Sequence, residues 1–250
     1  MQVVVDTLLT TYDKAGKGKL VVLLLHGWGD SLKTFDGLSR ELAKHYTVLR
    51  LDLPGFGATQ PPHEVWGLEQ YAKFVHAFLV KLQIPAIHAV VGHSNGGAVA
   101  ICGLAQQQLS AEKLVLLSSA GIRSRQNGRR FALKIVAKTG KAATFWLPAR
   151  TKKRMRQQLY KTAGSDMLIA PHLEDTFKKT VRQDVQTDAA SLRIPTLLVY
   201  GQDDAATPPI YGEILHNAID GSTLHILPGG HFIHQDQLPE VAQTIQGFLA

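Results

Sequence analysis

Residues 87–105 read IHAVVGHSNGGAVAICGLA, and they contain the most informative pattern in the chain. An apolar, strand-like run leads directly into the pattern G-x-S-x-G, and an alanine-rich helical stretch follows it. The five-residue pattern alone is weak evidence, but a strand before it and a helix after it supply the context that gives it meaning. A turn this sharp strains the backbone of Ser94, projects its hydroxyl, and leaves space only for glycine at Gly92, Gly96 and Gly97. Ser94 is therefore the predicted nucleophile, and an ordinary glycine-rich turn is the alternative.

Strand-like and helix-like blocks alternate along most of the chain. Apolar runs typical of strands occupy residues 3–5, 8–12, 20–25, 48–51, 87–91, 113–118, 196–200 and 224–227. Helical periodicity follows Ser94 and also occupies residues 34–44, 68–82, 208–217 and 239–249. Strand followed by helix, repeated several times, predicts an α/β fold with a mostly parallel, doubly wound sheet that is covered on both faces.

Residues 123–190 interrupt this alternation with helical patterns and no convincing strand. The simplest interpretation is a helical insertion over the carboxyl edge of the sheet, which is where ligands bind in sheets of this kind. The predicted organisation is therefore a core formed by residues 1–122 and 191–250, with residues 123–190 as a helical cap, or lid.

A serine hydroxyl is a weak nucleophile at neutral pH and needs a base within hydrogen-bond reach. His231 lies in the sequence PGGHF directly after the last predicted strand, so its loop can reach the same sheet edge as Ser94. The base in turn needs a carboxylate, and Asp203 and Asp204 follow the strand TLLVY at that edge. Asp204 is the preferred candidate and Asp203 the alternative, while turn capping would explain either residue without catalysis.

Acyl transfer also needs backbone N–H groups aimed at the carbonyl oxygen that becomes an anion. One N–H is expected from Asn95, the residue after the serine. The other is expected from the loop HGWG at residues 26–29, where the N–H of Trp28 is the candidate. The alternative for this loop is a tight turn with no chemical role.

Five motifs together resemble the α/β-hydrolase family. They are HGWGD, DLPGFG, GHSNGG, YGQDDAATP and PGGHFIHQDQLPE, and they follow the family's order between residues 26 and 240. The resemblance implies the α/β-hydrolase fold with a nucleophile elbow, a catalytic triad and a variable cap that shapes the substrate pocket. The residues that it assigns are Ser94 as nucleophile, Asp204 as acid, His231 as base, and Trp28 and Asn95 as oxyanion donors. Within the family, HGWG with DLPGFG is most similar to bacterial carboxylesterases.

The net charge of +7 is concentrated in one segment. Residues 123–190 contain sixteen Lys and Arg but only five Asp and Glu, whereas acids are in excess in the rest of the chain. A solvated outer helix face is one explanation, and an acidic partner, an anionic lipid surface or an anionic substrate is the sharper alternative. Nucleic acid is not an expected partner, because the apolar residues of the cap are needed to cover the pocket. The basic residues concerned are Arg129, Arg130, Lys134, Lys138, Lys152, Lys153, Arg154 and Arg156.

The composition is that of a globular protein of ordinary size. The chain has 250 residues, of which 45% are hydrophobic and 19% charged, so apolar material for a core is ample. The longest purely apolar run, Leu20–Leu25, is too short to cross a bilayer, and no signal peptide is recognised, so a cytoplasmic location is expected. The single cysteine, Cys102, excludes an internal disulfide. His231 and His234 are interpreted as parts of a catalytic loop, and neither a metal nor a cofactor is expected.

The sequence therefore predicts a serine hydrolase that cleaves carboxylic esters of small-to-medium acyl groups through an acyl-enzyme. A small-molecule ester is the expected substrate. Two alternatives stay open. One is hydrolysis of a carbon–carbon bond in a diketone by the same triad, and the other is a receptor-like protein that binds a ligand with little turnover.

Overall fold

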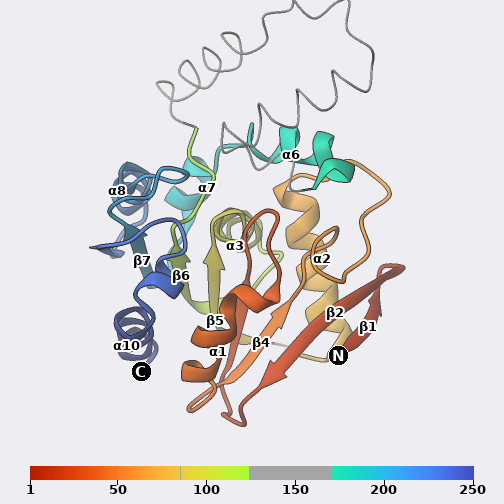
Figure 1. The fold of residues 1–250 in the computed structure, drawn as a ribbon, viewed down its shortest axis with the longest axis horizontal. Coiled ribbons are helices and arrows are strands. Elements are labelled where there is room, and N and C mark those ends of the chain that lie inside the picture. The colour runs from red at the N-terminus through yellow and green to blue at the C-terminus, as the bar shows by residue number, and fades with distance from the viewer. Residues whose placement is uncertain (85, 124–169) are drawn as a thin grey trace, which may run out of the picture.

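The computed structural model describes residues 1–84, 86–123 and 170–250 of the chain. Within these residues, eight strands form one sheet in the order β1-β2-β4-β3-β5-β6-β7-β8 (Figure 1). The strands are β1 (Gln2–Val5), β2 (Leu8–Ala15), β3 (Val21–Leu25), β4 (Thr47–Leu51), β5 (Ile87–His93), β6 (Ala111–Leu117), β7 (Thr196–Gly201) and β8 (Thr223–Leu227). The pairs β1–β2 and β2–β4 are antiparallel, and every other pair is parallel. The predicted α/β class with a mostly parallel sheet is confirmed.

Helices cover both faces of the sheet (Figure 1). Their bounds are η1 (Leu32–Phe35), α1 (Asp36–Leu42), α2 (Leu68–Lys81), α3 (Asn95–Ala105), η3 (Pro171–Leu173), α6 (Glu174–Thr180), α7 (Gln186–Ser191), α8 (Pro209–Ala218), α9 (Ile233–Asp236) and α10 (Leu238–Leu249). Helices α1, α9 and α10 pack on one face, and α2, α3, α7 and α8 pack on the other. This double cover is why the central strands have continuous apolar runs instead of alternating ones.

Strand β3 shows how the strand period of two builds both cores. Leu23 and Leu25 lie in the core shared with α2 and α3, whereas Val22 and Leu24 lie in the core shared with α1 and α10. All four side chains are fully buried. Complete burial of a Leu or Val side chain stabilises the folded state by about 1.5–3 kcal/mol, so these alternating positions fix the register of the strand.

Most predicted bounds lie within two residues of the observed ones, and two differences are larger. The strand predicted over residues 8–12 is too short, because β2 continues to Ala15 by pairing with β4. Arg50 on β4 supports this extension, since its guanidinium contacts Asp13 at 2.9 Å. The short helix α9 is also absent from the prediction, because a single turn has no periodicity that a sequence could reveal.

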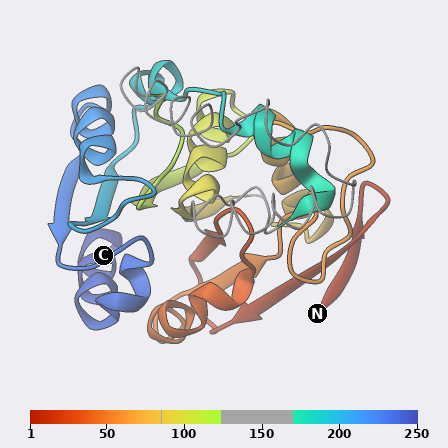
Figure 2. The same ribbon diagram turned by 45° about the horizontal axis from the view of Figure 1, so that its top comes forward.

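The segment between β6 and β7 is described up to residue 123 and again from residue 170 onward. Its helices α6 and α7 lie at the end of the molecule toward which β5 points (Figures 1 and 2). Leu173 lies against Gly55 in the loop after β4, and Phe177 lies against Trp28 in the loop after β3. Residues 129–156, which carry the predicted basic surface of the cap, fall outside the described residues. In the described part of the chain, no helix combines the length and the apolar character needed to cross a bilayer.

Candidate active site

Ser94 occupies the turn between β5 and α3 with a left-handed backbone, at φ 50° and ψ −119°. A positive φ is unfavourable for any residue with a side chain and persists only where the surrounding structure enforces it. Here the Ser94 N–H donates to the carbonyl of Leu117 on β6, and the Ser94 carbonyl accepts from Gly97 and Ala120, each at 3.0 Å. These bonds hold the half-buried Ser94 at the start of α3.

The turn is as crowded as its glycines predict. A Cβ at Gly92 would lie 2.5 Å from the Cα of Gly97, and the backbone cannot move to admit it. A Cβ at Gly27, in the loop after β3, would lie 3.0 Å from the Cβ of Ser94 and 3.1 Å from Nδ1 of His93. The HGWG loop therefore adjoins the serine directly, although about 65 residues separate the two in sequence.

The structure brings Asp204 and His231 together at the same sheet edge. Asp204 follows β7, and its side chain is fully buried. Nδ1 of His231, in the loop after β8, lies 2.8 Å from Oδ2 of this carboxylate. The His231 side chain remains 21% exposed, so its ring has access to the site. Asp203, the alternative, is exposed.

The Asp204 carboxylate accepts more bonds than the one from His231. Its Oδ1 accepts from the backbone N–H groups of Ala206 and Thr207 at 2.8 and 2.9 Å. The hydroxyl of Thr207 lies 2.8 Å from Oδ2. Burial alone would raise the pKa of Asp204, but the bonds from His231 and Thr207 outweigh it and hold the pKa below its usual range. Asp204 is therefore a carboxylate at neutral pH, and it caps the turn as well as holding the imidazole.

The loop that carries His231 is fixed at its backbone by His93, the residue before the serine. Nε2 of His93 lies 2.9 Å from the carbonyl oxygen of His231. The Gly230 N–H donates to Asp236 at 2.8 Å, and the Gln235 amide donates to the hydroxyl of Thr34 at 2.9 Å. The sequence assigns no role to His93 or Thr207, because His231, which both contact, lies 138 and 24 residues away from them.

Trp28 and Asn95 are the two expected oxyanion donors. Within the described residues, the backbone N–H groups of Trp28 and Asn95 donate no hydrogen bond. His26 lies buried beneath the HGWG loop, where its Nδ1 donates to the Gly27 carbonyl at 2.7 Å and its Nε2 accepts from the Leu53 N–H at 2.8 Å. The loop is therefore supported from below while its N–H groups remain available.

The side chain of Trp28 extends this loop toward the segment between β6 and β7. Its indole ring lies 4.8 Å from the ring of Phe56 and 5.1 Å from that of Phe177 on α6, between ring centroids. Contacts of this kind are favourable by about 0.5–1.5 kcal/mol beyond the burial of their area. Helix α6 is thus packed directly on the loop that offers a candidate oxyanion donor.

One expected contact is not formed. Among the described residues, neither the hydroxyl of Ser94 nor Nε2 of His231 has a hydrogen-bond partner. The His231 ring lies beside that of His93, with 4.8 Å between ring centroids. Catalytic hydrogen bonds in a site without substrate are often long and tighten only when substrate binds, so this geometry is compatible with a serine–histidine pair.

The comparison with protein families agrees with this architecture. The family model described as the alpha/beta hydrolase fold matches residues 21–237, which is most of the chain. The chain belongs to the α/β-hydrolase fold family. The family predicted from the five motifs is therefore confirmed.

Relatives of this α/β hydrolase include an esterase. The pimeloyl-[acyl-carrier protein] methyl ester esterase of Neisseria meningitidis is 28% identical over 220 residues, which cover 82% of this chain and 69% of the esterase. Two solved structures share the fold. The enol-lactonase of Burkholderia xenovorans superposes with a TM-score of 0.78, 20% identity and coverage of 100% and 99%. A meta-cleavage product hydrolase of Pseudomonas fluorescens superposes with a TM-score of 0.75, 21% identity and coverage of 99% and 96%.

Two further histidines of this α/β hydrolase surround the candidate base and are neutral. Burial holds the pKa of His93 well below its usual value, and burial lowers the pKa of His234 to about 4. The ring centroids of the two lie 4.7 Å apart. A cation at either position would be buried next to His231 and would disfavour the imidazolium that a base must form.

The neutral state of His234 predicts an acid-sensitive fold. An unfolded histidine takes up its proton near pH 6.5, whereas folded His234 does so near pH 4. The stability that His234 contributes is therefore complete above pH 6.5 and is lost as the pH falls toward 4, by about 3 kcal/mol. We expect His234→Gln, which cannot titrate there, to lose correspondingly less stability between pH 7 and pH 4 in urea unfolding. If the free energy of unfolding fell equally with pH in the wild type and in His234→Gln, His234 would not be the neutral, buried histidine described here.

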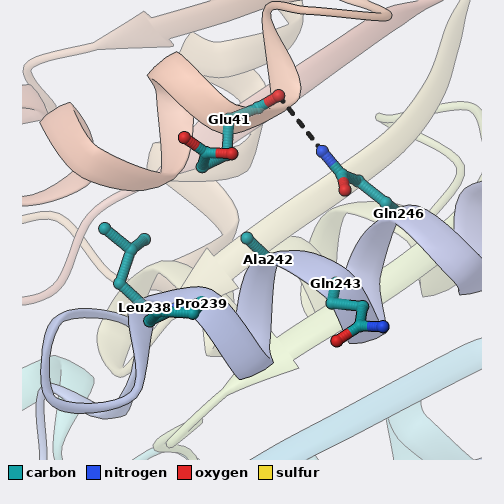
Figure 3. Close-up of a pocket in the computed structure, with 6 residues that line it drawn as sticks. All are labelled: Glu41, Leu238, Pro239, Ala242, Gln243 and Gln246. Carbon is teal, nitrogen blue, oxygen red and sulfur yellow. Dashed lines mark hydrogen bonds between the residues drawn. The ribbon is translucent and has the colours of Figure 1, made fainter.

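Figure 3 shows a surface groove of about 370 Å³ between α1 and α10. Its lining comes from Glu41, Leu238, Pro239, Ala242, Gln243 and Gln246. Gln246 donates to the backbone carbonyl of Glu41 across it at 3.2 Å, and none of the candidate catalytic residues lines it. Among residues 1–84, 86–123 and 170–250, no group of three His, Cys, Asp or Glu side chains could hold a metal ion.

Proposed function

We propose that this chain is a serine hydrolase that cleaves carboxylic esters of small-to-medium acyl groups through an acyl-enzyme. Ser94 is the nucleophile, His231 the base and Asp204 the acid of the triad. The observation that carries the proposal is the bond between the buried Asp204 carboxylate and Nδ1 of His231, at 2.8 Å. This bond fixes the tautomer in which Nε2 carries no proton and can accept one.

In the acylation step, Nε2 of His231 removes the proton of the Ser94 hydroxyl as the oxygen attacks the ester carbonyl carbon. The carbonyl oxygen becomes an anion, and the N–H groups of Trp28 and Asn95 donate hydrogen bonds to it. The positive end of α3 favours the same charge. Collapse of the intermediate breaks the bond to the alcohol, which leaves with the proton from His231.

Deacylation repeats these steps with water as the nucleophile. His231 removes a proton from water, and the resulting hydroxide attacks the carbonyl carbon of the acyl group on Ser94. The same two N–H groups stabilise the second oxyanion. When this intermediate collapses, the Ser94 oxygen recovers its proton from Nε2, and the carboxylic acid is released.

Two features support a substrate pocket beneath the insertion between β6 and β7, and we propose that residues 123–190 cover it. Phe177 on α6 packs on Trp28, and Leu173 packs against the loop after β4. The described part of the insertion therefore lies on the loops that surround Ser94. The esterase relative from Neisseria meningitidis favours an ester over other acyl compounds.

The proposal is tested with p-nitrophenyl acetate, butyrate, octanoate and palmitate, together with a fluorophosphonate that labels activated serines. We expect turnover of the short esters, a decline toward palmitate, and labelling at Ser94. Absence of turnover on every ester by folded protein would contradict the esterase assignment. Cleavage of a dienone-type acid by that protein would then identify the carbon–carbon hydrolase, and tight ligand binding unaffected by Ser94→Ala would identify the receptor-like alternative.

A further inference from the structure

Thr207, in the turn between β7 and α8, has no part in the steps above, yet its buried hydroxyl lies at the centre of the acid–base pair. Its Oγ1 is 2.8 Å from Oδ2 of Asp204 and 3.1 Å from Nδ1 of His231. The same oxygen is 2.9 Å from the backbone carbonyl of Ser118, at the end of β6. One hydroxyl thus contacts both titrating partners and a fixed carbonyl.

Counting protons shows that these three contacts cannot all be donated bonds. A threonine hydroxyl has one proton and can accept at its lone pairs. The Asp204 carboxylate and the Ser118 carbonyl only accept, so the hydroxyl donates to one of them at a time. Nδ1 of His231 carries the proton that it shares with Asp204, so it can donate to the hydroxyl but cannot accept from it.

The charges of the two acceptors determine which of them receives the hydroxyl proton of Thr207. With His231 neutral, the ionised Asp204 is the stronger acceptor and also the closer one, so it receives the hydroxyl proton. When His231 becomes an imidazolium, its Nδ1–H needs the full charge of Asp204. When the Thr207 hydroxyl rotates toward the Ser118 carbonyl, Asp204 no longer accepts its proton, so the whole carboxylate charge is available to Nδ1–H. The same rotation turns a lone pair of the Thr207 oxygen toward Nδ1–H.

We propose that Thr207 is a positioning residue whose hydroxyl donates to Asp204 in the resting state and turns to Ser118 as His231 takes up a proton. The inference rests on the proposed function, because it assumes that His231 cycles between the two charge states during turnover. Its chemical effect is to share the charge of Asp204 in the resting state and to leave that charge wholly to the imidazolium once the reaction has begun.

The carbonyl of Ser118 is held in place for this exchange. Ser118 is fully buried with φ 44°, and its N–H donates to the Val199 carbonyl at 2.9 Å. Thr207 is also anchored apart from its hydroxyl, since its N–H donates to Oδ1 of Asp204 at 2.9 Å. A Thr207→Val variant therefore keeps the backbone anchor and the side-chain shape and removes only the hydroxyl bonds.

The test compares Thr207→Val with Thr207→Ser, which keeps the hydroxyl. We expect Thr207→Val to lower kcat by roughly tenfold with KM little changed, because it removes the hydroxyl oxygen that accepts from the Nδ1–H of the imidazolium during the reaction step. The acidic limb of kcat/KM should move to higher pH by about half to one unit, since Asp204 then presents its full charge to His231 at rest. Thr207→Ser should restore both quantities to near the wild-type values.

A proton NMR titration supplies a readout that does not need turnover. The downfield Nδ1–H resonance of His231, identified by its loss in His231→Gln, should titrate at higher pH in Thr207→Val than in the wild type. The role of the hydroxyl would be overturned if the titration midpoint in Thr207→Val stayed in place or fell. It would also be overturned if Thr207→Ser lost as much kcat as Thr207→Val. If no ester is hydrolysed but the NMR midpoint moves as expected, the proposed function fails and the hydrogen-bond exchange stands.

Discussion

Replacing Ser94 by alanine is expected to lower kcat for p-nitrophenyl butyrate by a factor on the order of 10³–10⁶. The variant retains the oxyanion donors and the substrate pocket, but it has no oxygen that can form the acyl-enzyme. Alanine also tolerates the turn no worse than serine, since both carry a Cβ at the strained φ of 50°. Stopped assays at high enzyme concentration, with fluorophosphonate labelling in parallel, measure the residual rate and the loss of the reactive hydroxyl.

Ser119→Ala is the matched control for this experiment. Ser119 is also buried at the carboxyl edge of the sheet, and its hydroxyl donates to the Ala120 carbonyl at 3.1 Å. We expect this variant to retain activity within about threefold of the wild type, because its hydroxyl contacts none of the reacting groups. Undiminished turnover by Ser94→Ala, or an equal loss in both variants, would refute the assignment of the nucleophile.

The second prediction distinguishes the roles of two adjacent aspartates by the kcat of their asparagine variants. Asp204→Asn is expected to lower kcat by about 10⁴, because an amide donates where His231 needs an acceptor and selects the wrong imidazole tautomer. Asp203→Asn should leave kcat near the wild-type value, since Asp203 is exposed and no hydrogen bond involves its side chain within the described residues. Steady-state kinetics of the two variants decide between the residues that the sequence leaves as alternatives.

The two Asn variants also need a comparison of stability. Asp204 accepts bonds from Ala206, Thr207 and His231, so its replacement should lower the unfolding temperature as well as the rate. Assays well below that temperature keep the two effects apart. The assignment of Asp204 would be wrong if Asp203→Asn were the slower enzyme or if folded Asp204→Asn turned over like the wild type.

Local constraints made the serine turn predictable. The absence of space beside Gly92 depends on Gly96 and Gly97, which follow within five residues, so the order of the glycines already implies it. Strand positions were predictable for a related reason, because double burial requires continuous apolar runs. The extension of β2 to Ala15 was not, since it depends on pairing with β4, more than thirty residues away.

The supporting residues of the site lie beyond sequence reasoning for the same reason. His93 contacts the backbone of His231 from 138 residues away, and Thr207 contacts Ser118 from 89 residues away. A threonine after an aspartate is in general a turn residue, and only the folded chain shows that its hydroxyl meets His231. The sequence likewise could not distinguish Asp203 from Asp204, because both follow the same strand. Only the folded chain shows that the Asp204 carboxylate is buried.

The pairing of β6 with β7 has a consequence for the biosynthesis of the protein. Leu114–Leu117 pair in parallel with Thr196–Val199, and all four β6 residues are fully buried. Translation adds about 80 residues between the two strands, which takes roughly 4–16 s at ordinary elongation rates. Throughout that interval the nascent chain carries an apolar strand with an open edge, which is a template for aggregation. Shielding of β6 until β7 has been synthesised would therefore lower the risk of aggregation.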